Sequence, residues 1–78
     1  MDAFEAHQTE WEQLHQLAGL IGEELRGLDV ETASATVALH PGLSIRFVEV
    51  NRPVSDELVF GRITARTRND VVVDASAG

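Results

Sequence analysis

The residues best suited to chemistry are the histidines and serines, and their spacing fits no catalytic or metal site. His7 and His15 lie eight residues apart in a segment with helical periodicity, which separates them by about 12 Å, too far to share one ion. There is no cysteine, so there is no thiolate ligand. The serines follow no nucleophile-elbow pattern, and no glycine-rich phosphate loop occurs. We expect no enzyme, no metal and no cofactor.

Arginine is the second feature with chemical potential. Arg62, Arg66 and Arg68 alternate along a segment with the period of a strand, which places them on one face of a sheet. Such a face can be solvated, pair with acids on a neighbouring strand, or bind an acidic partner, a phosphate or RNA. The chain has only one Trp and three Phe for stacking on bases, which disfavours a nucleic-acid platform.

The net charge is −7, and residues 1–29 hold seven of the acids against one arginine. An acidic chain is poorly suited to neutralising phosphates, so nucleic acid is not the expected partner. The acids permit a different function, in which the protein mimics nucleic acid and inhibits a nucleic-acid-binding protein. A solvated helix face is the ordinary cause of such charge.

Residues 2–27 are predicted to form a long amphipathic helix. Asp2 and Glu5 have the spacing of a capping box, and Gly27 suits the left-handed residue after a helix. Leu17 and Leu20 widen the apolar stripe beyond what packing on a sheet requires, and Trp11 lies in the same segment. The stripe itself follows a heptad register. The predicted core residues of the helix are Phe4, Trp11, Leu14, Ala18, Ile21, Leu25 and Leu28.

Residues 32–74 are predicted to form a three- to four-stranded antiparallel sheet. Apolar and polar residues alternate over 32–40, 43–51 and 58–67, and a short apolar run follows at 71–74. His40, Pro41 and Gly42 indicate a turn, residues 51–56 a loop containing Pro53, and residues 68–70 a three-residue hairpin turn. The predicted core residues of the sheet are Val37, Leu39, Ile45, Phe47, Val59, Ile63 and Val73.

The fold class is therefore α+β, with the N-terminal helix packed on an antiparallel β-meander in one domain of residues 1–78. Residues 75–78 are small and are expected to form a frayed tail. In outline, a helix followed by short strands, with Gly61 opening a bent Gly-Arg-Ile-Thr stretch, resembles small Sm-like and SH3-like barrels. That resemblance implies a barrel that binds nucleic acid or anions, and it carries over no site residue.

The expected function is a non-catalytic protein–protein interaction module, acting in assembly, as an adaptor or as a regulatory subunit. A domain this small has a limited core, and the wide apolar stripe favours a homodimer formed through the helix. No apolar run is long enough to span a bilayer, and the acidic N-terminus is unlike a signal peptide, so a cytoplasmic protein is expected. The predicted partner-binding residues are Trp11, Leu17, Leu20, Arg62, Arg66 and Arg68.

Overall fold

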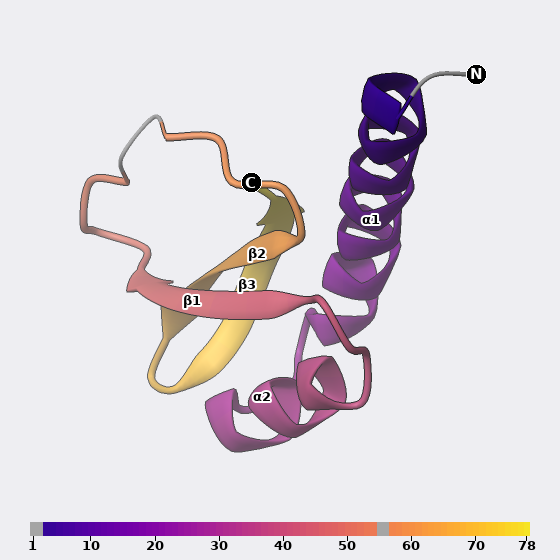
Figure 1. The fold of residues 1–78 in the computed structure, drawn as a ribbon. Coiled ribbons are helices and arrows are strands. Elements are labelled where there is room, and N and C mark those ends of the chain that lie inside the picture. The colour runs from indigo at the N-terminus through magenta and orange to yellow at the C-terminus, as the bar shows by residue number, and fades with distance from the viewer. Residues whose placement is uncertain (1–2, 55–56) are drawn as a thin grey trace.

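The computed structural model contains two helices and a three-stranded sheet, in the order α1 (Ala3–Leu25), α2 (Val30–Ala38), β1 (Ser44–Glu49), β2 (Arg62–Arg68) and β3 (Val71–Ala77) (Figure 1). It describes the backbone of residues 3–54 and 57–78, and the side chains of residues 10–54 and 57–78. The α+β class is confirmed. The expected sheet of three to four strands has three, and its expected antiparallel meander is wrong, because β1 and β2 run parallel and the first predicted strand is a helix.

Helix α1 occupies the predicted N-terminal segment and ends before Gly27, whose φ of 89° is left-handed. Ala18, Ile21 and Leu25 are buried, as the heptad register predicts. Trp11 was expected in the core and is 52% exposed, because the turn of residues 10–13 lies wholly at the surface. The predicted core residue Phe4 lies outside the described side chains.

Helix α2 replaces the strand expected over residues 32–40. Asp29 caps its N-terminus in an extended conformation, and the Oδ2 atom accepts a hydrogen bond from the Thr32 amide at 3.4 Å. Ala33 and Val37 lie four residues apart and are both buried, whereas Leu39, expected in the core, is 78% exposed. Alternating alanines fit a period of two and a helical spacing of four equally well, and the cap favours the helix.

Strands β1 and β2 run parallel, with Ile45 opposite Ile63 and Phe47 opposite Ala65. The antiparallel pairing expected across residues 51–56 is therefore wrong. The connection spans residues 50–61, and a connection of about a dozen residues is long enough to bring the chain back to a parallel neighbour. The predicted strand 58–67 began too early, because residues 58–61 belong to this connection.

The β2–β3 hairpin has a two-residue turn rather than the predicted three-residue one. Asn69 and Asp70 both have positive φ, at 53° and 63°, which suits the twist of a tight hairpin. The register of the β2–β3 pairing also shifts between Arg66 and Thr67. Consequently Val72 is buried at 1% exposure and the expected core residue Val73 is 40% exposed. Residues 75–77, expected to fray, complete β3.

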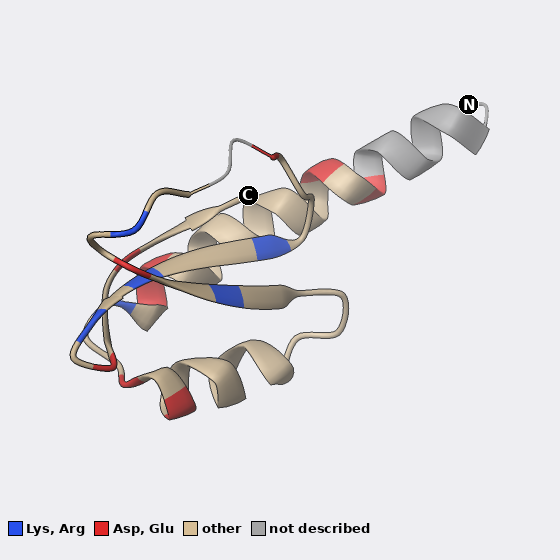
Figure 2. Ribbon diagram, turned by 90° about the vertical axis from the view of Figure 1, so that its left-hand side faces the viewer, with Lys and Arg blue, Asp and Glu red and all other residues tan. Residues whose placement is uncertain are grey.

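The two helices cover one face of the sheet, and the β1–β2 connection lies over the other (Figures 1 and 2). Between α1 and α2, the chain pairs with the outer edge of β3 through Gly27 N–H to Val72 O and Val72 N–H to Leu28 O, both at 2.8 Å. Neither helix in the described part of the chain is long and apolar enough to cross a membrane. The buried apolar core consists of Ala18, Ile21, Leu25, Ala33, Val37, Ile63, Ala65 and Val72.

Candidate functional site

The described residues of the β1–β2 connection, 50–54 and 57–61, which we call the crossover loop, are the strongest candidate site. Both of its ends are fixed to the sheet. The Val50 amide donates to Thr67 O at 3.0 Å where the loop leaves β1, and Gly61 O accepts from the Ser44 amide at 2.9 Å where it returns to β2. Between these ends, residues 53–54 and 57–59 are in neither helix, strand nor turn. The described residues of the loop are thus largely irregular, and both of its ends are tethered to adjacent strands.

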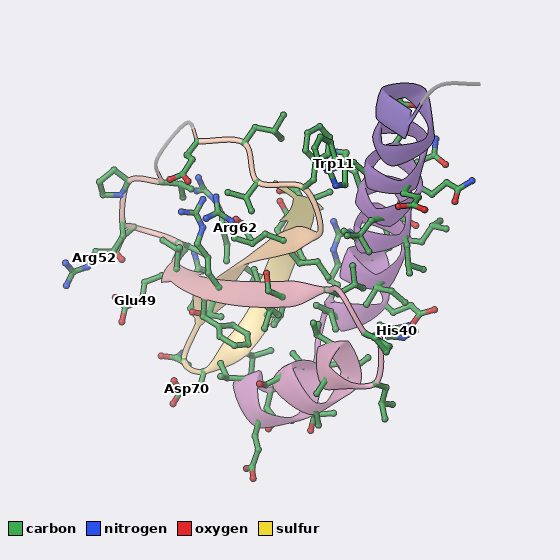
Figure 3. All side chains as sticks on the ribbon, in the orientation of Figure 1. Trp11, His40, Glu49, Arg52, Arg62 and Asp70 are labelled. Atoms are coloured by element: carbon green, nitrogen blue, oxygen red, sulfur yellow. The ribbon has the colours of Figure 1, made fainter. Side chains whose placement is uncertain are left out.

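Arg62 supports the crossover loop from the sheet. Its side chain is half-buried and lies in the space framed by the loop, whereas Arg52 points away from the molecule (Figure 3). The guanidinium Nη2 donates to the backbone oxygen of Glu57 at 3.1 Å, and Nε donates to Gly78 O at 3.4 Å. A hydrogen bond from a charged donor holds this part of the loop at a fixed distance from β2.

Arg46 and Thr64 continue the same network on the sheet. They are partners across β1 and β2, and Arg46 Nε donates to Thr64 Oγ1 at 2.9 Å. Thr64 Oγ1 donates in turn to Gly78 O at 2.6 Å, and the Gly78 amide donates to Arg62 O at 2.7 Å. The end of β3 is therefore joined to the same groups that support the loop.

A shallow depression separates the crossover loop from the open face of the sheet. Polar groups of the sheet form one side, and loop side chains form the other. Its lining residues are Arg46, Val54, Glu57, Leu58, Thr64, Arg66, Ser76, Ala77 and Gly78.

The C-terminal end of the crossover loop packs against α1. The ring of Phe60 stacks on Trp11 with centroids 6.4 Å apart and planes at 19°, and meets His15 edge-on at 5.3 Å. Next along the chain, Gly61 has a φ of 80°, and a Cβ there would lie 2.7 Å from Leu14 Cδ2. This end of the loop is thus held by close packing on α1 in addition to the hydrogen bond from the Ser44 amide to Gly61 O.

Several apolar side chains at the crossover loop remain exposed. Leu58 is 61% exposed, Phe60 45% and Trp11 52%. Glu57 is also exposed, although its backbone oxygen is bound from below. Leu58 and Phe60 therefore offer side chains to solvent while the backbone on either side of them is held at Glu57 O and Gly61 O, which is the arrangement of a contact surface.

The predicted partner-binding residues are divided among several places. Arg62, Arg66 and Trp11 border the crossover loop, while Arg68 lies near the β2–β3 turn and lines a second depression with Glu49 and Asp70. Leu17 packs partly buried against the core, and Leu20 is 62% exposed on α1. Arg66 and Arg68 therefore line different depressions.

Sequence reasoning missed Arg46, Thr64, Leu58 and Phe60 as members of this site. The length of the segment between the two strongest strand signals could have indicated a crossover, since residues 50–61 contain Pro53 and a dozen positions. Assigning residues 58–61 to a strand concealed that length.

Metal binding has no support in the described part of the chain, where no three His, Cys, Asp or Glu side chains gather. His15 Nδ1 is buried without a hydrogen-bond partner among the described residues, and its ring instead contacts Phe60. His7 lies outside the described side chains. Comparison of the chain with protein-family models, with curated proteins and with solved structures gave no match.

Proposed function

We propose that this protein is a non-catalytic protein-interaction module that inserts its crossover loop into the substrate cleft of a peptidase and inhibits that enzyme. The observation that carries the proposal is the hydrogen bond from Arg62 to Glu57 O, which fixes an otherwise irregular exposed loop to the central strand. A loop ordered before binding loses less conformational entropy on association, so more of its contact energy appears as affinity.

A peptidase cleft fits the loop because such clefts bind extended chain through its backbone. Residues 53–54 and 57–59 are not engaged in helix, strand or turn. Glu57 O and Val59 O accept hydrogen bonds from Arg62, so it is the other backbone groups of these residues that would pair with an enzyme. Protease–inhibitor interfaces are of standard size, about 800 Å² per partner, and use surfaces that move little on binding. A domain of 8.5 kDa can supply such an area from one loop and its surroundings.

Tethering also explains how a bound loop would resist turnover. The two ends of the loop are joined to adjacent parallel strands, and the C-terminal end is packed under Trp11 and Leu14. If an enzyme cut the loop, both new ends would stay attached to the sheet and leave the cleft slowly. A free peptide of the same sequence has no such restraint.

The proposal is tested by steady-state inhibition of subtilisin, chymotrypsin, trypsin, elastase and a glutamyl endopeptidase. The wild-type protein is expected to inhibit at least one of them competitively, at micromolar concentration or below. Arg62→Gln should weaken inhibition roughly 10–100-fold, because the lost hydrogen bond has a charged donor. Arg26→Gln is the matched control, since it also removes the charge and a hydrogen bond of an arginine, and Arg26 contacts Asp74 and lines neither depression beside the loop.

Thermal melts of both variants separate loss of the loop support from loss of the fold. Equal inhibition by wild type and Arg62→Gln would contradict the role of Arg62. Rapid degradation of the wild type by every enzyme, or no inhibition by any of them at 100-fold molar excess, would overturn the proposed function.

Self-association through α1 is a separate proposal, supported by the exposure of Leu20 at 62%. Sedimentation should detect a dimer at about hundred-micromolar concentration, and Leu20→Glu should remove it. A cytoplasmic location is also a proposal, which fractionation of host cells would test.

Binding of nucleic acid or an anion through Arg62, Arg66 and Arg68 has weaker support, because Arg62 is engaged with the loop, and Arg66 and Arg68 line different depressions. Titration of RNA at low salt would reveal it, since such binding weakens steeply with salt. Mimicry of nucleic acid by the acids of α1 would appear instead as displacement of RNA from its binding protein.

A further inference from the structure

Trp11 packs on the crossover loop, and this contact leaves about half of the residue exposed. It lies in a turn of α1 whose residues 10–13 are all exposed, and its ring contacts Phe60 of the crossover loop. One side of the indole stacks on that ring, and 52% of the residue faces solvent. Half-exposed tryptophan beside a binding loop is typical of residues that dominate protein interfaces.

The exposed surface around Trp11 is continuous with the crossover loop. Phe60 joins the loop to α1, and Leu58, two residues earlier, is 61% exposed. Exposed carboxylates border this surface at Glu12 on the helix and Glu57 on the loop. Figure 3 shows Trp11 between α1 and the returning end of the loop. An apolar patch with an acidic border is complementary to a partner surface with exposed Lys or Arg.

We infer that Trp11, Leu58 and Phe60 form a second contact with the peptidase proposed above, against a basic patch at the rim of its cleft. This inference rests on the proposed function and adds the site that would select among peptidases with similar clefts. The loop occupies the cleft, the indole covers the rim, and Glu12 accelerates association through its charge.

The first test measures binding of variants to the peptidase that the wild type inhibits most strongly in the panel, at nanomolar concentration of the inhibitor. Trp11→Ala should weaken binding roughly 10–100-fold. Leu20→Ala is the matched control, because it removes an equally exposed apolar side chain from the opposite side of α1. Glu12→Gln should lower the association rate several-fold at low salt only. Glu23→Gln changes the same charge about three turns away and should have little effect.

A second measurement distinguishes direct contact from positioning of the loop by the indole. Trp11 is the single tryptophan, so 5-fluorotryptophan labels this position alone. The solvent isotope shift of its fluorine resonance between H₂O and D₂O should be present in the free protein and disappear in the complex. If the shift persists in the complex, or if Trp11→Ala binds as tightly as wild type, the inference is overturned. Failure of the wild type to bind any peptidase would instead overturn the proposed function, and this inference with it.

Discussion

Single residues at the ends of the crossover loop determine whether it can be held in place. Arg62 binds the loop from below at Glu57 O, and Gly61 lets the chain return to β2 between Leu14 and Gly42. The role of Arg62 depends on its charged donor, and that of Gly61 depends on the absence of a side chain. Both residues act on the loop backbone, so substitutions there should alter binding and stability to different extents.

Gly61→Ala should destabilise the protein by about 2–4 kcal/mol, because the residue has positive φ and its Cβ would also meet Leu14. The distances to Leu14 Cδ2 and Gly42 O would be 2.7 and 2.9 Å. Urea denaturation followed by circular dichroism measures the difference. Gly19→Ala is the control, since nothing lies within 4 Å of its Cβ position in α1. That change should stabilise the helix by up to about 1 kcal/mol, and a similar loss in both variants would refute the steric account.

The elements show where sequence patterns decide a structure and where they do not. The α1 register and the strand at Ser44–Glu49 follow from apolar spacing and were predicted. Alternation in residues 32–40 could not separate helix from strand, because Ala33 and Val37 satisfy both periods and alanine adds little packing volume. The cap at Asp29 carried the deciding signal.

Strand pairing was the harder part to predict, since parallel and antiparallel partners bury the same face of β1. The direction of β2 depends on the length of the connection, and the sequence marks its end only by Gly61. Because the direction of β2 could not be predicted, only part of the site could be predicted. Arg62 and Trp11 were singled out, but nothing local in the sequence brings them to one loop.

The hairpin register predicts opposite outcomes for two neighbouring valines. Val72→Ala should cost about 2 kcal/mol because its side chain is fully buried. Val73→Ala should cost less than about 0.5 kcal/mol, since Val73 lies at the surface. Chemical denaturation of both variants compares them directly. A larger loss for Val73→Ala would indicate the three-residue turn and exclude the two-residue one.

The cap of α2 predicts a dependence of stability on pH. The hydrogen bond from Thr32 lowers the pKa of Asp29 below its ordinary value of 3.8. Because the folded-state pKa is depressed, the ionised carboxylate contributes stability above the unfolded-state pKa, and this contribution is lost as pH falls through the folded-state pKa. The melting temperature of wild type should therefore exceed that of Asp29→Ala at pH 6, with a gap that narrows below about pH 4. A constant gap from pH 6 to pH 2 would contradict the assigned cap.

At the scale of the whole molecule, the sheet lies between the two helices and the crossover loop. The helices bury the core on one face, and the crossover loop lies over the other (Figure 2). Gly78, which follows β3, accepts hydrogen bonds from Arg62 and Thr64 of β2. Arg62 also binds the crossover loop, so the end of β3 is connected to the loop. Stability of the domain and order in the loop are therefore coupled.

Removal of residues 75–78 tests this coupling. It deletes about half of β3 and the Gly78 oxygen that accepts the hydrogen bond from Thr64. The truncated chain should therefore melt at a lower temperature. Amide exchange at residues 57–60 should accelerate strongly relative to wild type. Ser76→Ala, an exposed substitution in the same strand, is the control. Unchanged exchange in the loop of the truncated chain would show that β3 does not support it.

The central claim is that the crossover loop occupies a peptidase cleft, and blocking the cleft tests it most directly. The peptidase inhibited most strongly is immobilised in two forms, one free and one with its cleft closed by a small covalent active-site inhibitor. Binding of the wild-type protein to both is measured by surface plasmon resonance. The account predicts tight binding to the free enzyme and loss of at least 100-fold in affinity for the blocked one. Equal affinity for the two forms would place the contact outside the cleft and contradict the account.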